Sequence, residues 1–349
     1  MNLLSFYDAC TLCPRNCGVN RNRGDRGFCG ETAALRVAVA NIHKGEEPPI
    51  TGLGGSGTIF VTGCTLGCLF CQNWQVSQHG MGRVVETDEL ARIMLSLQDV
   101  GAENINIVTG SHALPALCEG VIWAREEGLE IPILWNSSAY ESVAAVEAGS
   151  PYIDVYLPDL KTLDEEIGRR YFHAPDYGMK AQEAILKMIE LKPLVYGPSR
   201  HNRRTLAQVP ALQEEKTVET EDAVSVLRQG VVIRHLVLPG QLEATRQVLE
   251  WFVTHAQGKA LLSLMTQYTP VYQGGHVSQG SIPGRYVDQR EFDTLMRWLD
   301  DYEIEGGFYQ ELVQDDEWLP DFNRINPFSS ELSVPVWHWT VGFVRSSEK

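Results

Sequence analysis

Six short apolar runs alternate with segments of helical periodicity along this chain of 349 residues. The runs cover residues 58–62, 104–109, 131–135, 152–157, 231–238 and 260–268. They are almost continuously apolar and rich in β-branched residues, which is typical of parallel strands covered on both faces. The alternation predicts a parallel α/β architecture, either an open six-stranded barrel or a doubly wound sheet.

Helices are expected between these runs. The first lies between Thr87 and Gly101, and its apolar residues keep helical spacing on one face. The others are predicted over residues 113–127, 139–148, 179–191, 241–256 and 288–300. In both architectures, ligands bind at the carboxyl ends of the strands, so polar residues at those ends are the first candidates for function.

The chain divides into three predicted segments. Residues 1–50 form a cysteine-rich, loop-built metal-binding module, 51–300 form the core, and 301–349 form an aromatic-rich carboxy-terminal extension. The aromatic residues of the extension are Trp318, Phe322, Phe328, Trp337 and Trp339. They either cover the open side of a barrel or pack as ordinary carboxy-terminal structure.

Charge and cysteine usage narrow the function classes. The net charge of −16 argues against broad nucleic-acid or anionic-membrane binding. No run of 18 apolar residues offers a membrane span, and the first residues do not read as a signal peptide, so we expect a cytoplasmic protein. Seven of the eight cysteines precede residue 72, and in a cytosolic chain such clustering favours metal binding over disulfides.

Three cysteines follow the first predicted strand in the stretch GCTLGCLFCQNW, residues 63–74. They are Cys64, Cys68 and Cys71, hereafter the cysteine triad. Thiolates on a compact loop bind iron–sulfur clusters or soft metals. Three ligands leave one iron of a four-iron cluster open, and an open coordination position is the mark of a reactive metal site.

Polar side chains follow the other predicted strands and converge on this loop. They are Thr109, Ser111 and His112 after the second run, Asn136 and Ser137 after the third, Asp159 and Lys161 after the fourth, and Arg234 and His235 within the fifth. Capping of the next helix or a surface ion pair would explain any one of them alone. Their shared location favours a site.

The C-x3-C-x2-C spacing, with Phe70 before the last cysteine, resembles the radical S-adenosylmethionine (radical SAM) superfamily. The resemblance implies an open parallel β/α barrel of about six strands. It also implies a [4Fe-4S] cluster whose unique iron binds the amino and carboxyl groups of S-adenosylmethionine. One-electron cleavage of that cofactor then produces a 5′-deoxyadenosyl radical, which abstracts a hydrogen atom from the substrate.

Longer motifs resemble one branch, the PflX-like proteins, which are similar to pyruvate formate-lyase-activating enzymes. These motifs are CTLCPRNCGVNRNRGDRGFCGE, HKGEEPPITG, NINIVTGSHALP, LPDLK and IRHLVLPG, and the resemblance spans about residues 10–300. It implies a glycine of a glycyl-radical enzyme as the target and a flavodoxin- or ferredoxin-type electron donor. The GGE motif of many members is absent, with VTGSH in its place, and residues 193–229 look like an insertion.

The resemblance also suggests roles for the candidate residues. Phe70 would pack near the adenine. Thr109, Ser111 and His112 would meet the amino acid end of the cofactor, Asn136 and Ser137 its ribose or carboxylate, and Asp159 and Lys161 would border it. Arg234 would pair with a cofactor carboxylate, and His235 would be an inward-facing polar residue. No catalytic residue is assigned.

Two further groups have competing interpretations. Glu46 and Glu47 either orient the substrate or belong to a solvated turn before Pro48, and the turn is favoured. The basic run containing Arg15 and Arg21 is expected to be a solvated loop.

Four more cysteines lie close together near the amino terminus. They are Cys10, Cys13, Cys17 and Cys29, hereafter the cysteine quartet. The quartet fits either zinc or a second iron–sulfur cluster. A structural role is the default, and electron relay or partner docking is the alternative. For the whole chain, the rivals to a glycyl-radical activase are radical modification of a peptide or small molecule, an iron–sulfur sensor and a zinc scaffold.

Overall fold

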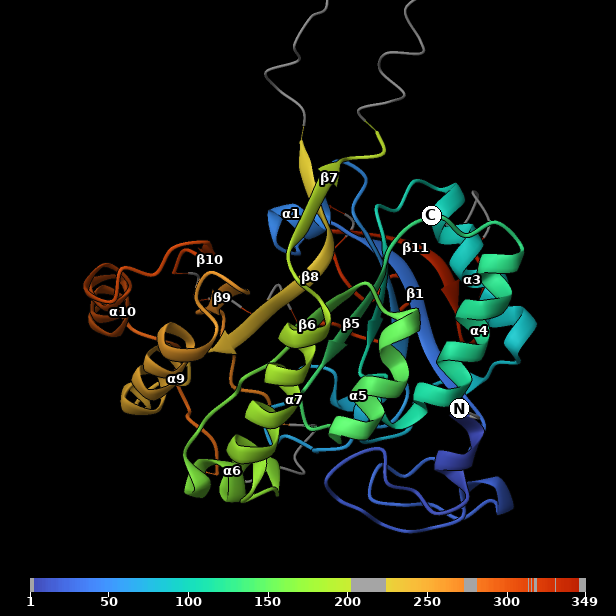
Figure 1. Cartoon of the computed structure of the whole chain (residues 1–349), viewed down its shortest axis with the longest axis horizontal. Coiled ribbons are helices and arrows are strands. Elements are labelled where there is room, and N and C mark those ends of the chain that lie inside the picture. The colour runs from blue at the N-terminus through green and yellow to red at the C-terminus, as the bar shows by residue number, and fades with distance from the viewer. Residues whose placement is uncertain are drawn as a thin grey trace, which may run out of the picture.

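The computed structural model describes residues 3–201, 224–272, 281–312, 314, 316, 319–329 and 331–344. A single sheet runs through the molecule, with strand order β10-β9-β8-β6-β5-β4-β2-β1-β11-β12 (Figure 1). Seven consecutive strands of this order, from β10 to β2, pair in parallel. The chain therefore has the predicted α/β fold with a mostly parallel sheet.

All six predicted strands are present. They are β2 (Ser56–Val61), β4 (Ile105–Val108), β5 (Ile133–Ser137), β6 (Val155–Pro158), β8 (Ser225–Leu236) and β9 (Leu261–Met265). Every residue of β2, β4 and β6 is buried, which explains their continuous apolar character.

Further strands extend this sheet. They are β1 (Arg36–His43), β3 (Arg83–Val84), β7 (Val195–Pro198), β10 (Gly307–Tyr309), β11 (Ser333–His338) and β12 (Gly342–Phe343). β1 pairs antiparallel with both β2 and β11, so it connects the core to the carboxy-terminal extension. The part of the predicted segment 1–50 that precedes β1, residues 3–35 among those described, is here called the amino-terminal module.

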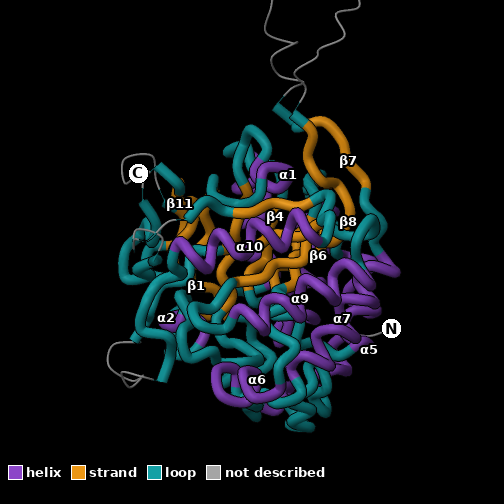
Figure 2. The backbone as a smooth tube through the Cα atoms, turned by 90° about the vertical axis from the view of Figure 1, so that its left-hand side faces the viewer, coloured by secondary structure: helices purple, strands orange, loops and turns teal. Residues whose placement is uncertain are grey.

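Helices flank the sheet, and Figure 2 shows α10 in front of the strands, α9 just below it, and α7 and α5 to the lower right. The predicted helices are α3 (Thr87–Asp99), α4 (Leu114–Glu126), α5 (Val143–Gly149), α7 (Tyr177–Leu191), α9 (Leu242–His255) and α10 (Gln289–Asp301). The shorter ones are α1 (Pro48–Thr51), α2 (Trp74–Ser77), α6 (Glu165–Phe172), η1 (Leu3–Tyr7), η2 (Arg21–Arg23), η3 (Ser111–Ala113) and η4 (Ser150–Tyr152). Among the described residues, no helix combines the length and the apolar character that crossing a membrane requires.

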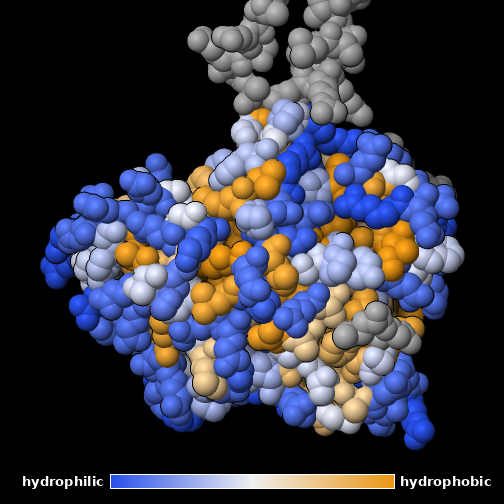
Figure 3. Space-filling model, viewed as in Figure 1, coloured by the Kyte–Doolittle hydropathy of each residue, from blue (hydrophilic) through white to orange (hydrophobic). Residues whose placement is uncertain are grey.

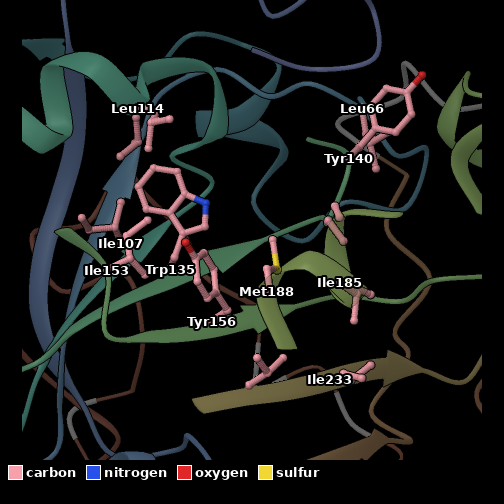
Figure 4. Packing of buried hydrophobic residues seen from close by; sticks show 14 of the residues in the cluster. Leu66, Ile107, Leu114, Trp135, Tyr140, Ile153, Tyr156, Ile185, Met188 and Ile233 are labelled. Carbon is pink, nitrogen blue, oxygen red and sulfur yellow. The ribbon is translucent and has the colours of Figure 1, made fainter. Parts of the chain in front are cut away.

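The main hydrophobic core lies between the sheet and these helices. Figure 4 shows the Trp135 ring of β5 beside Leu114 of α4 and Ile107 of β4, all buried in one cluster. The outer surface in the view of Figure 3 is mostly hydrophilic, with hydrophobic residues gathered in patches toward the middle of that face. Packing of the helices on the sheet thus holds the carboxyl ends of the strands in place relative to one another.

Candidate active site at the carboxyl ends of the strands

A cavity of about 250 Å³, here called the cluster cavity, lies where the parallel strands end. All three cysteines of the triad line it. Seven of the ten predicted cofactor-binding residues line it as well: Phe70, Thr109, Asn136, Ser137, Asp159, Lys161 and Arg234. The structure thus brings together residues from four different strand ends and the cysteine loop.

The cysteine triad lies on the loop between β2 and α2. The backbone N–H of Leu66 donates to Cys64 Sγ at 3.4 Å, and Ser77 Oγ lies 3.3 Å from Cys71 Sγ. Burial raises the pKa of the Cys71 thiol to about 11 and also raises that of Cys68. These buried thiols need a cation to become thiolates, so this donor set fits an iron–sulfur cluster.

Asp159 and Lys161 follow β6, and their side chains form an ion pair of 2.6 Å in the cluster cavity. Burial would lower the pKa of Lys161, but the Asp159 carboxylate outweighs it and the pKa lies above its ordinary value. The Tyr177 hydroxyl accepts from the Lys161 backbone N–H at 3.0 Å and so fixes the turn. The cavity therefore contains an ammonium that is charged at neutral pH and paired with Asp159, and that could also hold a carboxylate.

Thr109 follows β4 with a backbone φ of +64°. A β-branched residue in the left-handed region is strained, and such strain is concentrated at functional sites. The distortion occurs where the VTGSH sequence replaces the GGE motif, and Thr109 lines the cavity.

Glu141, a buried residue before α5, ties two strand ends together. Its carboxylate accepts from Trp135 Nε1 at 2.6 Å and from Ser137 Oγ at 2.9 Å, and it is also hydrogen-bonded by Ser111. Burial raises the pKa of Glu141 above its ordinary value. Glu141 is thus a positioning residue beneath the cavity, and sequence reasoning missed it.

Three of the predicted cofactor-binding residues are not brought to the cluster cavity. Ser111 is buried against Glu141. His112 Nε2 lies 2.7 Å from the Thr62 carbonyl, and burial lowers its pKa to about 3. His235 is buried between the Leu160 carbonyl and Thr245 Oγ1, at 2.7 and 3.0 Å from its two ring nitrogens. All three point into the protein and position the loops.

Phe70 lines the cavity as part of an aromatic cluster. Its ring makes edge contacts with Tyr171, Phe172 and Tyr268, with centroid distances of 5.9, 5.9 and 5.4 Å. The ring is therefore core and cavity wall at once.

A second cavity of about 300 Å³, here called the adjoining cavity, shares Asn136, Arg234 and Gln267 with the cluster cavity. It contains Glu46 and Glu47, which were expected in a solvated turn. The structure corrects that interpretation, because both carboxylates pair with the buried Arg234 guanidinium. Arg234 therefore has protein partners and does not depend on a cofactor carboxylate.

The carboxy-terminal extension reaches the adjoining cavity through Phe328, whose ring lies 5.7 Å from that of Phe60. Phe322 also packs against Phe60, at 5.2 Å. Trp337 is buried in β11, and Trp339 packs on the core. Trp318 lies outside the described residues.

The cysteine quartet lies in the amino-terminal module, beside the triad. The other three thiols of the quartet all influence the Cys13 thiol electrostatically, and the pKa of Cys13 is raised by burial to about 12. Cys29 and Cys64 line a common cavity. Among the described residues, no three or more histidine, cysteine, aspartate or glutamate side chains are arranged as a site for a single metal ion.

Two arginines attach this module to the core, contrary to the expectation of a solvated loop. Arg15 donates to the Thr65 and Phe172 carbonyls at 3.0 and 3.1 Å, and its guanidinium stacks on Phe28 at 3.8 Å. Arg21 is buried and donates to the His112 carbonyl. The module is therefore held directly against the cysteine triad loop.

Sequence reasoning also missed several lining residues of the cluster cavity. These are Gln72, Asn73, Ser77, Met265 and Gln267. The first two immediately follow Cys71, so their position beside the last ligand was an available signal. Met265 and Gln267 end the sixth predicted strand, where the strand-end rule applies equally.

Comparison with known proteins supports the assignment of the core. Residues 58–194 match the Radical SAM superfamily. The chain is 26% identical over 276 residues to uncharacterized protein MJ0674 of Methanocaldococcus jannaschii, covering 77% of this chain and 68% of that protein.

Solved structures give weaker likenesses. SuiB of Streptococcus suis bound to the precursor peptide SuiA has a TM-score of 0.46 and 15% identity, over 71% of this chain and 46% of that one. Methylornithine synthase (PylB) has a TM-score of 0.42 and 13% identity, over 82% and 74%. The chain thus spans less than half the length of SuiB.

Proposed function

We propose that this chain, which carries a radical SAM domain in residues 58–194, binds a [4Fe-4S] cluster and S-adenosylmethionine in the cluster cavity and abstracts a hydrogen atom from a substrate in the adjoining cavity. The observation that supports this most is the convergence of the cysteine triad with Asp159, Lys161 and Asn136 on one cavity that continues into another. One cavity would hold the cofactor and the other its target.

The residues present fit these groups. The triad offers three thiolates and leaves a fourth iron for an external ligand. When bound, the cluster and cofactor supply a 5′-deoxyadenosyl radical through one-electron reductive cleavage. Lys161 would hold a carboxylate, and Asn136 and Ser137 would offer amide and hydroxyl groups to a ribose. Phe70 offers an apolar wall for a purine.

The protein's further task is to exclude water and fix the target. Phe60, Phe328 and Met265 form apolar walls of the adjoining cavity, where water would otherwise compete for a primary radical. Asn136 and Arg234 line both cavities, so a substrate that contacts them lies next to the cofactor site.

The PflX-like resemblance supports a protein target, a glycine of a glycyl-radical enzyme, and the alternative is a residue of another peptide or a small molecule. The electron donor would be a flavodoxin- or ferredoxin-type protein in the cytoplasm. We further propose that residues 1–50 form a metal-binding module and residues 51–300 the core that carries the radical chemistry. Residues 301–349 would cover the open side of that core.

Anaerobic reconstitution with iron and sulfide, followed by reduction and addition of S-adenosylmethionine, tests the function. We expect 5′-deoxyadenosine from the wild type and none from Cys71→Ser, because that variant loses a cluster ligand. Cys118→Ala is the matched control, since Cys118 is buried on α4, away from the triad. A cluster-loaded wild type that never cleaves the cofactor would indicate a sensor, and a protein that takes up only zinc would indicate a scaffold.

A further inference from the structure

The described part of the adjoining cavity wall contains more carboxylates than cationic groups. Among the described residues, its charged side chains are Glu46, Glu47 and Arg234. Burial would raise the pKa of Glu47, but the Arg234 guanidinium outweighs it and lowers the pKa, so Glu47 is ionised at neutral pH. His43 is also in the wall, and burial lowers its pKa, so it is neutral there. Two carboxylates therefore face one guanidinium.

Arg234 is committed mainly to Glu47. Its Nε donates to Glu47 Oε1 at 2.8 Å and its Nη2 to Glu47 Oε2 at 2.5 Å, which is the bidentate arrangement that arginine and carboxylate prefer. Ser263 also hydrogen-bonds Glu47. Glu46 shares only the Nη2 atom of Arg234. Its other oxygen accepts from Asn106 Nδ2 at a long 3.4 Å and lies 3.7 Å from Nδ1 of the neutral His43 ring. Glu46 is therefore the carboxylate whose charge is least compensated.

The wall of the same cavity includes a further acceptor. Gln310 lines the cavity, and no donor among the described residues hydrogen-bonds its buried Oε1 atom. The amide is oriented by its Nε2, which donates to Gln267 Oε1 at 2.9 Å. A buried acceptor without a donor costs free energy, so this wall favours a ligand with N–H groups.

Aromatic side chains form much of the remaining wall. Phe60, Phe328 and Tyr309 line the cavity, and aromatic faces attract cations that lie over them. The volume of about 300 Å³ is at the lower end of the range for small-molecule sites, roughly 300–1,000 Å³. The space suits a group of about the size of one amino acid.

We propose that the substrate presents a cationic nitrogen, an ammonium or a guanidinium, to Glu46 and Gln310 in the adjoining cavity. This inference rests on the proposed function, because it names the chemistry of the group held beside the cofactor site. The same chemistry is offered by a free amino acid such as lysine or arginine and by a lysine or arginine side chain of a peptide. An anionic group would have to displace carboxylates from Arg234.

Binding measured without reductant tests this independently of cofactor cleavage. The reconstituted full chain with S-adenosylmethionine is titrated calorimetrically with L-lysine, L-norleucine, L-arginine and L-citrulline. Blocked pentapeptides with a central lysine or norleucine form the second arm. We expect the cationic member of at least one pair to bind at least tenfold more tightly than its neutral counterpart. The arm that responds identifies the source as free or peptide-borne.

Variants then test whether Glu46 causes the preference for cationic probes. Glu46→Gln should reduce the cationic preference at least fivefold, whereas Glu243→Gln, an exposed carboxylate on α9, should keep it. Iron content and circular dichroism show whether each variant is folded and loaded. The wild-type series decides the question even if Glu46→Gln fails to fold.

Equal binding of cationic and neutral probes, a preference for neutral ones, or no binding of any probe would overturn the inference. A protein that forms 5′-deoxyadenosine but shows no cationic preference would keep the proposed function and lose this inference. The reverse outcome, cationic preference without cofactor cleavage, would reject the proposed function.

Discussion

Cys29 of the quartet and Cys64 of the triad line the same cavity, although they belong to two separate cysteine clusters. The approach is close. A methyl group built on Gly63, the residue before Cys64, would lie 3.0 Å from the Cys29 carbonyl oxygen. Whatever the quartet binds is therefore next to the proposed cluster loop, which suits both a brace for that loop and a relay for electrons.

The quartet is expected to bind metal, and Cys29→Ser should remove it. If the quartet holds a four-iron cluster, the iron content of the reconstituted protein should fall by about four atoms per chain. If it holds zinc, about one zinc should be lost with no change in iron. Elemental analysis with sulfide determination measures both.

Cys118→Ala again serves as the control for that measurement. An unchanged content of iron and zinc in both Cys29→Ser and Cys13→Ser would show that the quartet binds no metal. To distinguish a relay from a brace, the triad cluster is oxidised in the wild type and in Cys29→Ser, and its re-reduction is followed by visible absorbance. Slower re-reduction in the variant would indicate a relay for electrons, and an equal rate would indicate a brace.

The junction between the two cysteine groups should not tolerate a side chain at position 63. Gly63 has φ +94°, and an added methyl would meet Glu31 Cγ at 2.6 Å as well as Cys29. Gly63→Ala should lower the free energy of unfolding by about 2–4 kcal/mol, from strain and overpacking together. Urea denaturation of the metal-free protein measures this loss.

Gly128→Ala separates the cost of backbone strain from the cost of overpacking. Gly128 has a similar φ of +101°, but nothing lies within 4 Å of the added methyl. Gly128→Ala should therefore lower the free energy of unfolding only by the cost of backbone strain, about 1–2 kcal/mol. Equal losses in the free energy of unfolding for Gly63→Ala and Gly128→Ala would mean that the amino-terminal module does not pack tightly against the cysteine triad loop at Gly63.

The alternation of strands and helices could be predicted from sequence because each element has its own local period. The strand-end rule predicted that candidate residues would lie close together, and seven of the ten, including Asp159 and Lys161, line the cluster cavity. β1 was not predicted, because its residues were assigned to a loop-built segment. It is a strand through its pairing with β2 and with β11, the latter almost 300 residues later. Local pattern carries no information on such a partner.

The burial of Glu46 and Glu47 was unpredictable for the same physical reason. Their partner Arg234 is 187 residues or more away in sequence, and without it two adjacent glutamates before Pro48 read as a surface turn. Ser111 and His112 show the limit of the strand-end rule. A polar residue at a strand end hydrogen-bonds either a ligand or the protein, and in this structure Ser111 bonds Glu141 and His112 lies beside the Thr62 carbonyl.

The Arg234 ion-pair network should contribute strongly to stability. Arg234→Met leaves two buried carboxylates without their cation, and we expect a loss of about 3–5 kcal/mol in the free energy of unfolding. Asp88→Asn, which breaks an exposed pair with Arg92 at 3.0 Å, should cost less than about 0.5 kcal/mol. Guanidinium would screen these charges, so urea is the suitable denaturant. A loss in Arg234→Met no larger than in the control would mean that the network is not structural.

Glu291 should make part of the stability pH-dependent. Burial would raise the pKa of this carboxyl, but hydrogen bonds from Arg285 and from the backbone of Asp288 and Gly240 lower it to about 2. Because the folded-state pKa lies below the ordinary 4.5, the stabilisation is present above pH 4.5 and is lost as the pH falls toward 2. Glu291 also completes the capping box of α10.

Glu291→Gln should therefore lower the free energy of unfolding by about 1–2 kcal/mol at pH 7. The difference from wild type should narrow as the pH falls from about 5 to 3, because only the wild type must then protonate the carboxylate. Urea midpoints at pH 7, 5, 4 and 3.5 measure this, with Glu243→Gln as an exposed control that should show no such trend. A difference that stays constant across this range would mean that the charge of Glu291 does not determine its contribution, since the ion pair with Arg285 does not survive protonation.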